Sequence, residues 1–414
     1  MCRRPHAIIR QVVFGLFFLL ACGTFVLRNA HAAEIAVDDN WTRIKLDETF
    51  RAEGVATGDF NHDGLMDVAA GDYWYAAPDW KKHEVRPVGE YKWNGSYSQC
   101  FVEFANDING DGWDDLIIVG FPGDPFSWYE NPQNAEGHWK KHEIWTSACN
   151  ETVLFTDITG DGKPELVLGS QPERQMGYLE IPPADKIRER WKFTPISEPG
   201  DPAQNGTFKY YHGLGAGDFN GDGRADVLIP HGWWEQPEKL DGSLWVFHPW
   251  KLSEKPDGAP LPAANLHVID LDLDGDHDVI MSSAHKYGVW WFENTGSGKE
   301  MVFHKIDDTV SQTHALLMVD LKGNGNPHLV TGKRFWAHNG SDPGEKEPVA
   351  MLTYEITREK GQPPKFVRRE IGAGLDTGIG TQFEICDFNA DGQLDVILSN
   401  KKGVNVLLQK PTQK

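Results

Sequence analysis

The sequence contains little cysteine, and its cysteines follow no metal-binding or redox spacing. Of five Cys in 414 residues, two lie within the first 22 residues, and the others are Cys100, Cys149 and Cys386. No CxxC or CxxCH motif is present, which argues against a zinc ribbon or a c-type haem site. Cys100 and Cys149 could pair with each other, but three cysteines cannot all pair, and we expect buried free thiols.

Basic residues are in the minority. The chain has 40 Lys and Arg against 61 Asp and Glu, a formal net charge of −21. Because an acidic surface repels a phosphate backbone, we expect no nucleic-acid partner. The sequence also lacks a GxSxG motif, an HExxH motif, a P-loop and a GxGxxG motif before a helix. The catalytic classes that these motifs mark are therefore not indicated.

Residues 1–32 differ from the rest of the chain and resemble a secretory signal peptide. Arg3, Arg4 and Arg10 precede the apolar run "VVFGLFFLLACGTFVL", and Ala30 and Ala32 offer the small side chains that signal peptidase requires. The apolar run is shorter than the roughly 20 residues that span a bilayer. We expect cleavage after Ala32, a secreted or periplasmic protein, and no stable membrane span after processing. A lipoprotein anchored at Cys22 is the alternative, because "LLAC" resembles a lipobox, although Leu20 fits that pattern poorly.

Aromatic and turn-forming residues are abundant. The chain has 16 Trp, 21 Phe and 10 Tyr beside 43 Gly and 25 Pro, a combination of strand formers and turn formers. This composition predicts a mostly β structure.

One acidic motif recurs along the chain. Its copies are spaced 48 to 67 residues apart, an interval typical of propeller blades and other repeats. The seven copies are "DFNHDGLMD" at 59, "DINGDGWDD" at 107, "DITGDGKPE" at 157, "DFNGDGRAD" at 218, "DLDLDGDHD" at 270, "DLKGNGNPH" at 320 and "DFNADGQLD" at 387.

Each copy lies within a longer repeated pattern. An apolar run such as "GVATGDF" precedes it, a β-branched run such as "DVLIP" follows, and then come an aromatic pair such as "GWWEQP" and a run such as "WKKHEV". Four strands per repeat and seven repeats predict an all-β, seven-bladed β-propeller that forms a single domain over residues 33–414.

The two ends of the chain complement each other. The last copy is followed by "LDVILS" and "GVNVLLQ" but by no fourth strand, whereas "WTRIKL", residues 41–46, stands before the first copy. We expect this N-terminal strand to complete the last blade and close the ring, which leaves no free sheet edge.

The repeats resemble FG-GAP or VCBS repeats, which occur in integrin-type propellers and in many exported bacterial proteins. Phe219, Gly221, Asp222 and Gly223, with the apolar run that follows, carry the resemblance, which extends over roughly residues 41–409. It implies a propeller with calcium in the loops between the first and second strands. Such propellers have many functions, so it does not name an activity.

The loops suit a hard cation. Positions 1, 3, 5 and 9 of D-x-[DN]-x-D-G-x-x-D supply side-chain oxygens, and position 7 supplies a carbonyl, enough for calcium. An EF-hand would need Glu at position 12, where this chain has residues such as Ala70 and Ile118. We predict about six structural calcium ions, with ligands Asp59, Asn61, Asp63, Asp67, Asp107, Asn109, Asp111, Asp115, Asp157, Thr159, Asp161, Glu165, Asp218, Asn220, Asp222, Asp226, Asp270, Asp272, Asp274, Asp278, Asp387, Asn389, Asp391 and Asp395.

The sixth copy departs from the pattern. Lys322, Asn324 and His328 replace acids and leave Asp320 as its only carboxylate. We predict no metal there, and we expect the Lys322 ammonium to occupy the metal's place.

A second set of polar residues is predicted on the opposite end of the ring, where first strands begin and second strands end. His212, His314, Lys333 and Arg334 are the candidate catalytic residues at that end. The candidate ligand-binding residues are Glu53, Glu151, Trp233, His285, Tyr287, Trp336 and His338. A further metal ion could bind at the His/Glu pocket.

Two functions compete for these residues. In the first, the protein is an exported, calcium-stabilised propeller that binds a carbohydrate or cell-surface ligand, with aromatic faces stacked on a sugar ring and Arg or Lys on its carboxylate. In the alternative, it is a sugar lyase, dehydratase or hydrolase in which His212 or His314 acts as a base or binds a metal. The stretch "THALLMVDLKGNG" is similar to the propeller of aldos-2-ulose dehydratases, which is consistent with the alternative.

A non-functional interpretation also remains, in which these residues only pack and satisfy one another at the mouth of a channel. The structure can separate these interpretations. An enzyme should bring His212, His314 and a carboxylate within a few ångströms around an enclosed pocket, whereas an adhesion module should present a flat, open face.

Overall fold

The computed structural model describes residues 36–38, 40–171, 173–255, 257–296, 298–372 and 374–410. The expected signal peptide, its cleavage site and Cys22 lie outside these residues. Apart from one 3₁₀ turn, η1 (Ala337–Gly340), the regular elements of the described residues are β-strands. None of the described residues form a helix with the length and apolar character needed to cross a bilayer.

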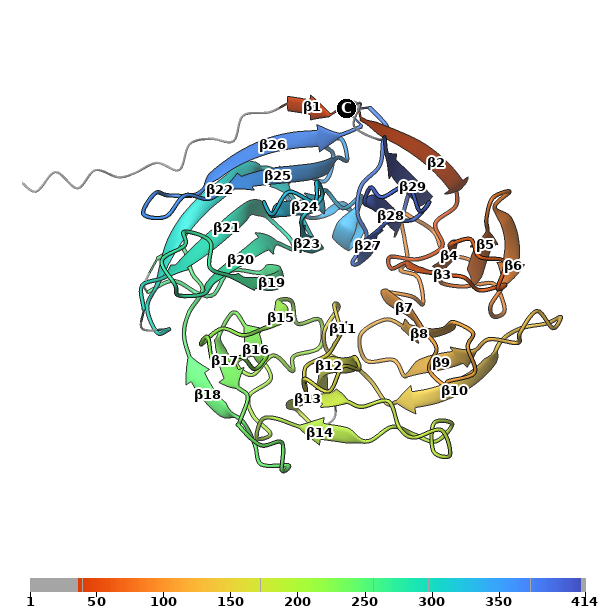
Figure 1. The fold of residues 1–414 in the computed structure, drawn as a ribbon, viewed down its shortest axis with the longest axis horizontal. Helices are drawn as coiled ribbons and strands as arrows, with labels where there is room; N and C mark the ends of the chain where they lie inside the picture. The colour runs from red at the N-terminus through yellow and green to blue at the C-terminus, as the bar shows by residue number, and fades with distance from the viewer. Residues whose placement is uncertain are drawn as a thin grey trace, which may run out of the picture.

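The strands form a β-propeller, with sheets arranged around a central axis (Figure 1). The first sheet contains β3 (Ala56–Gly58), β4 (Asp67–Ala70), β5 (Tyr73–Ala76) and β6 (Lys81–Glu84). The second contains β7 (Val102–Asn106), β8 (Asp115–Val119), β9 (Phe126–Glu130) and β10 (Lys140–Trp145). The third contains β11 (Leu154–Thr156), β12 (Glu165–Ser170), β13 (Gln175–Leu179) and β14 (Phe193–Pro195).

The remaining strands complete the ring. An eight-stranded sheet contains β15 (Leu214–Gly217), β16 (Asp226–Ile229), β17 (Gly232–Glu235), β18 (Val246–Pro249), β19 (Ala263–Ile269), β20 (Asp278–Ser283), β21 (Tyr287–Asn294) and β22 (Met301–Ser311). The next contains β23 (Leu316–Val319), β24 (His328–Gly332), β25 (Met351–Thr357), β26 (Lys365–Ile371) and, at its outer edge, β1 (Ala36–Asp38). The last contains β27 (Phe383–Cys386), β28 (Asp395–Asn400), β29 (Gly403–Gln409) and β2 (Trp41–Asp47).

The expectation of seven separate blades is corrected by this topology. Among the described residues, five sheets of four or five strands stand as separate blades, and the fourth and fifth repeats share the eight-stranded sheet. The two innermost strands of these repeats, β15 and β19, run parallel and are close enough to pair, with Leu214 opposite Asn265 and Gly215 opposite Leu266. Glycines at positions 215 and 217 allow this approach, because a Cβ atom at Gly215 would lie 2.5 Å from the Leu266 carbonyl oxygen.

The repeated residues explain the blade structure. In most copies, the acid at position 9 begins the second strand and accepts backbone N–H groups from the loop and from the end of the third strand. Asp67, for example, accepts from Phe60 N at 3.1 Å and from Ala77 N at 2.8 Å. In the third copy, Glu165 accepts backbone N–H groups only from the loop, those of Ile158 and Thr159. The second strands themselves are buried along their whole length, as in β8 and β12. The acids therefore tie three strands of a blade together.

A stacked Trp–His pair recurs in four of the repeats. A Trp on the third strand stacks on a His of the fourth strand, with ring centroids 4.1–4.5 Å apart in Trp74–His83, Trp128–His142, Trp233–His248 and Trp291–His304. In three of these repeats the His also contacts a Glu at the end of the third strand, in the pairs His142–Glu130, His248–Glu235 and His304–Glu293. These histidines serve packing.

The N-terminal strand completes the last sheet. β2 pairs antiparallel with β29, from Trp41 opposite Gln409 to Asp47 opposite Val404. This is the pairing that the sequence indicates for residues 41–46. The parallel pairing of β1 with β26 was not anticipated. Cys100, Cys149 and Cys386 are free thiols, and Cys100 and Cys149 are buried.

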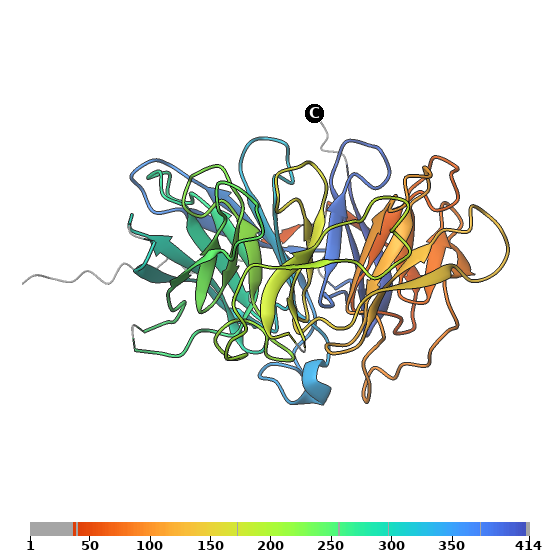
Figure 2. The same cartoon turned by 90° about the horizontal axis from the view of Figure 1, so that it is seen from below.

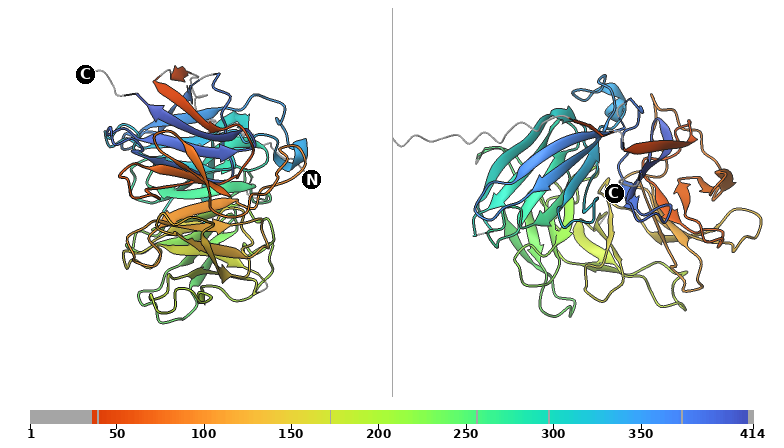
Figure 3. Two further views of the ribbon diagram at one scale, coloured as in Figure 1. Left: turned by 90° about the vertical axis from the view of Figure 1, so that its right-hand side faces the viewer. Right: turned by 45° about the horizontal axis from the view of Figure 1, so that its top comes forward.

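The two ends of the ring differ. The acidic loops follow the first strand of each repeat and lie at one end, where β29 also ends. η1 projects from the other end (Figures 2 and 3). We call this second end the mouth; it is where the first strands begin and the second strands end.

Candidate functional site

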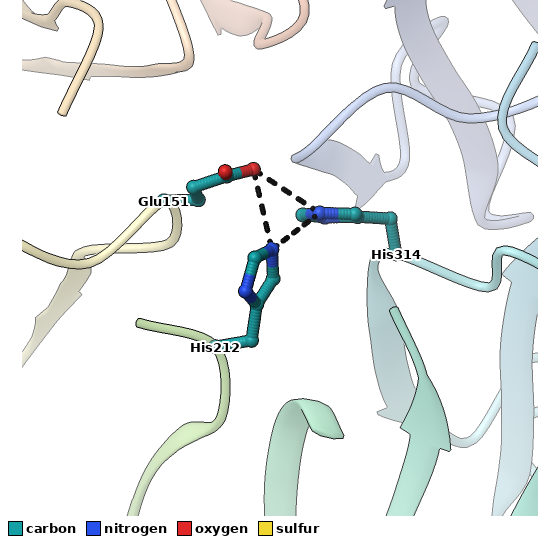
Figure 4. Close-up of side chains that lie close together, drawn as sticks. All are labelled: Glu151, His212 and His314. Carbon is teal, nitrogen blue, oxygen red and sulfur yellow. Dashed lines mark hydrogen bonds and ion pairs between the residues drawn. The ribbon is translucent and has the colours of Figure 1, made fainter. Parts of the chain in front are cut away.

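Three side chains converge at the mouth. Glu151, His212 and His314 lie just before the first strands β11, β15 and β23, and they point toward one another (Figure 4). The two Nε2 atoms are 3.0 Å apart, and the Glu151 Oε2 atom lies 3.4 Å from that of His212 and 3.2 Å from that of His314. We call Glu151, His212 and His314 the inner triad.

The backbone holds these three residues in place. Asn150 and Tyr211 form a parallel bridge, which sets Glu151 beside His212. On either side of His314, the Thr313 hydroxyl donates to the Ser283 carbonyl at 3.1 Å, and the Ala315 carbonyl accepts from Thr331 Oγ1 at 2.6 Å. His314 is fully buried, and Glu151 is 5% exposed. The triad is therefore fixed at the start of the third, fourth and sixth repeats.

A buried cation lies beside the inner triad. The Arg334 guanidinium is 3.8 Å from Glu151 Oε2 and 3.9 Å from Glu53 Oε1, and Arg334 is only 1% exposed. Glu53 also accepts hydrogen bonds from the amide and hydroxyl of Ser98. None of the Arg334 guanidinium nitrogens makes a hydrogen bond within the described residues. Arg334 thus acts here as a charge between two carboxyl groups.

Burial and this charge determine which groups are ionised. Burial, and next the charge of Arg334, lower the pKa of His314 to about 3. Burial raises the pKa of Glu53 to about 7, against the opposing effect of Arg334. A neutral His314 offers a lone pair to a metal ion at neutral pH, whereas a histidine with so low a pKa is a weak general base.

A second group of ligand-type side chains lies next to the first. His285, His338 and Asp342, which we call the outer triad, place three ligand atoms within 4.8 Å of one another. Asp342 Oδ2 lies 2.8 Å from His338 Nδ1 and 3.4 Å from His285 Nδ1. Burial disfavours ionisation of Asp342, but hydrogen bonds with the two histidines outweigh it and hold the pKa of that carboxyl below its usual range.

The outer triad lines a cavity of about 490 Å³ together with Glu151 and His212 of the inner triad. Its polar lining comes from Glu151, His212, His285, His338 and Asp342. Its aromatic lining comes from Tyr97, Phe121, Phe208 and Tyr210. Phe208 and Tyr210 are 53% and 39% exposed, so their rings are available to a ligand.

The structure separates the predicted site residues into two groups. Glu151, His212, His285 and His338 line the cavity. His314 completes the inner triad, and Arg334 lies beside Glu151 and Glu53. The other candidates lie elsewhere, and their positions are given next.

Lys333 is 2% exposed, and its ammonium lies 3.5 Å from the Arg334 carbonyl oxygen. Trp233 is buried in a blade against Phe219 and His248. The Tyr287 hydroxyl donates to Glu347 at 2.5 Å, and the Trp336 ring packs on Trp93.

Sequence reasoning missed Asp342 and the aromatic lining. Asp342 lies in the segment 333–350 between β24 and β25, which has no counterpart in the repeat pattern. Tyr97 lies in the long connection between β6 and β7, and its hydroxyl accepts a hydrogen bond from His338 N at 3.2 Å. Length was the available signal for Asp342, because the connection between β24 and β25 is longer than those between the second and third strands of the other repeats. Length does not single out Tyr97, because the connection between β14 and β15 is at least as long as that between β6 and β7.

Six of the seven acidic loops at the opposite end share one hydrogen-bond pattern. The first Asp accepts the amides of positions 5 and 6; in the fourth copy, Asp218 accepts from Asp222 N at 3.0 Å and from Gly223 N at 2.9 Å. The fifth copy differs, because Asp274 N donates to Asp272 Oδ1 at 3.2 Å and Asp270 Oδ1 has no hydrogen-bond partner within the described residues. Two of the loops each bring three carboxylates within 4.8 Å of one another, close enough to hold a metal ion. One group is Asp157, Asp161 and Glu165, and the other is Asp270, Asp272 and Asp274.

The sixth loop differs from the expectation in one respect. The Lys322 ammonium does not occupy the position of a metal ion, because it lies 2.8 Å from Glu355 Oε2 on β25. The amides of Lys322, Asn324 and Gly325 donate to Asp320, so a single carboxylate supports this turn.

Comparisons with known proteins agree with the repeat pattern. A family model of the FG-GAP-like repeat matches residues 107–168, which hold the second and third acidic loops. A comparison with curated protein sequences found no match.

Several solved structures are similar in fold. One is an Agrocybe aegerita lectin that recognises non-reducing terminal N-acetylglucosamine (14% identity, TM-score 0.47, 92% of this chain and 86% of that one covered). Another is the exotype rhamnogalacturonan lyase YesX (14% identity, TM-score 0.45, 93% of this chain and 76% of that one covered). A third is the V. cholerae biofilm matrix protein Bap1 (10% identity, TM-score 0.43, 93% of this chain and 92% of that one covered). At this level of similarity they carry no information on function.

Proposed function

We propose that the cavity at the mouth binds a carbohydrate, with an acidic or oxidised sugar as the favoured class. The observation that carries the proposal is the convergence of Glu151, His212 and His314 beneath exposed aromatic rings. Aromatic faces stack on the apolar face of a sugar, and a few fixed polar groups orient its hydroxyl or carboxylate oxygens. The cavity supplies both components.

The inner triad also suits a divalent metal ion. Two imidazole nitrogens and a carboxylate oxygen are 3.0–3.4 Å apart, close to the separation of about 3.3 Å between ligands that each lie 2.0–2.1 Å from a tetrahedral ion. Hydrogen bonds alone satisfy three such atoms poorly, because the two Nε2 atoms face each other as well as the carboxylate. A metal ion held there would bind and polarise a sugar oxygen.

Catalysis is the second candidate function. The two histidines and a carboxylate meet within a few ångströms beside a cavity rather than on a flat face, which is the arrangement expected of an enzyme. Arg334 places positive charge behind the triad, where it would stabilise negative charge on a bound carboxylate or enolate. A lyase or dehydratase acting on a uronic or oxidised sugar would use these features.

We further propose that the acidic loops hold structural calcium and that the protein is exported. The alternating carboxylate and amide oxygens support the first proposal, and the N-terminal sequence supports the second.

The pocket is tested with the purified protein and a panel of neutral, acidic and oxidised saccharides, followed by thermal shift and product formation. The variant His314→Ala should lose at least tenfold in affinity, or all turnover, while its calcium content stays unchanged. His248→Ala is the matched control, because His248 is a packing histidine outside the cavity. Full binding by His314→Ala, or no response to any saccharide, would contradict the proposed function.

A further inference from the structure

The outer triad does not belong to the blade repeat. The packing histidines of the ring follow one rule: each stacks on a Trp and, in three repeats, meets a Glu. His285, His338 and Asp342 follow no such rule. Their nearest aromatic neighbours are other histidines, with His285 4.3 Å from the His212 ring and 4.4 Å from the His338 ring. Repeat packing therefore does not account for this cluster.

The segment that carries His338 and Asp342 is held in an unfavourable conformation. Trp336, His338 and Asn339 have positive φ angles of 53°, 46° and 53°, although none of them is glycine. Such residues cost free energy and persist where the surroundings fix them, often at functional sites. Here the Tyr97 hydroxyl binds His338 N, and the Lys401 ammonium donates to the Trp336 carbonyl at 3.1 Å. This conformation turns His338 and Asp342 over the cavity.

We propose that the outer triad is a second divalent-metal site and that the mouth holds a two-metal centre, an inference that rests on the proposed function of the inner triad. Two imidazoles and one carboxylate are a ligand set typical of Zn²⁺ and related transition metals. His212 of the inner triad lies against His285 of the outer one, so the two ions would share the cavity.

The second ion makes the site more selective. Two cations side by side bind ligands that offer two neighbouring oxygens, such as an α-hydroxycarboxylate or a vicinal hydroxyl and carbonyl. Sugars oxidised at one carbon carry this pair with an anionic carboxylate or a carbonyl oxygen, whereas the vicinal diols of unoxidised sugars offer only neutral hydroxyl oxygens, which are weaker ligands. The outer triad thus favours saccharides in which a carboxylate or carbonyl oxygen lies next to a hydroxyl.

Zinc stoichiometry of the chelated and dialysed full chain tests the inference. Reconstitution uses Zn²⁺ alone, with excess Ca²⁺ present to fill the acidic loops, and elemental analysis gives bound zinc per chain. We expect two zinc ions in the wild type and one in Asp342→Asn or His338→Ala. The variant His248→Ala should retain two zinc ions. It is the control for zinc that binds at a surface His–Glu pair such as His248–Glu235.

The results separate this inference from the proposed function. One zinc ion or none in the wild type, or two in Asp342→Asn and His338→Ala with unchanged melting temperatures, would overturn the two-metal centre. Asp342→Asn keeps the side-chain size, so loss of one zinc ion without loss of fold supports the site. Saccharide binding is measured separately: two zinc ions without any saccharide response would contradict the proposed function and leave the metal inference standing.

Discussion

Asp47 accepts hydrogen bonds from three side chains in different parts of the ring. Its carboxylate accepts from Arg51 Nε at 2.9 Å, Lys82 Nζ at 2.7 Å and the Tyr75 hydroxyl at 3.0 Å, which connects β2 with β5 and β6. Burial opposes ionisation, but hydrogen bonds from Lys82, the Thr49 amide and Arg51 outweigh it and lower the pKa of Asp47 to about 2. A single carboxylate thus couples two neighbouring sheets.

This coupling predicts a pH dependence of stability. The folded-state pKa lies below the unfolded value of about 3.9, so the stabilisation is present above pH 4 and is lost as the pH falls toward 2. Asp47→Asn should lower the free energy of unfolding by about 1 to 2 kcal/mol at pH 7, a figure reduced for solvent screening of Lys82. Urea unfolding at several pH values measures this. The control variant Glu48→Gln, at an exposed position, should change the free energy of unfolding little. Equal losses of stability in the two variants would show that the hydrogen bonds of Asp47 do not stabilise the fold.

The position of a single residue in the fold could be predicted where the repeat pattern determines it. Glu151, His212 and His314 were placed on one end because each lies the same distance before a loop Asp, and this spacing fixes where a first strand begins. Trp233 was misplaced because residues alternate faces along β17, and its ring points into the blade. Asp342 could not be placed, because its position depends on three left-handed residues in an insertion and not on any period.

At the scale of elements, β2 decides whether the last sheet has a free edge. It pairs with β29 along nearly its whole length, and Arg43 Nε donates to Asn405 Oδ1 at 2.7 Å. Deletion of residues 33–47 should expose β29 and cause aggregation or a large fall in melting temperature. Light scattering and calorimetry measure the two effects.

A shorter deletion serves as the control for that experiment. Removal of residues 33–38 takes away β1, which only adds an outer strand to β26, and leaves β2 in place. This variant should stay monodisperse. An unchanged melting temperature in the longer deletion would show that β2 is dispensable.

The number of strands was easier to predict than their division into separate sheets. The four-strand pattern identified each strand group, since loops and aromatic pairs mark strand ends in the sequence. The merger of β15 with β19 depends on how closely two innermost strands approach, and small residues at 215–217 permit it without any change in the pattern.

At the scale of the whole molecule, the acidic loops should add to stability together. With about 1 mM calcium and a dissociation constant of about 0.1 mM, each occupied loop would contribute roughly 1.4 kcal/mol. Six loops would then contribute on the order of 8 kcal/mol, comparable with the net stability of a domain. We expect close to six calcium ions by elemental analysis and a marked fall in melting temperature on chelation. One ion or none would refute the calcium assignment.

The pairing of β2 with β29 also has a consequence for the order in which the chain is made. Residues paired across these two strands are up to 368 positions apart, as in Trp41 and Gln409, so the N-terminal strand must wait for nearly the entire chain before it finds its partner. During synthesis, which proceeds from the N-terminus, the earlier sheets can form while the ring stays open. The final step is therefore the capture of β2 by a strand that emerges last, and a ribosome stalled before residue 403 would hold an open propeller with an unpaired β2.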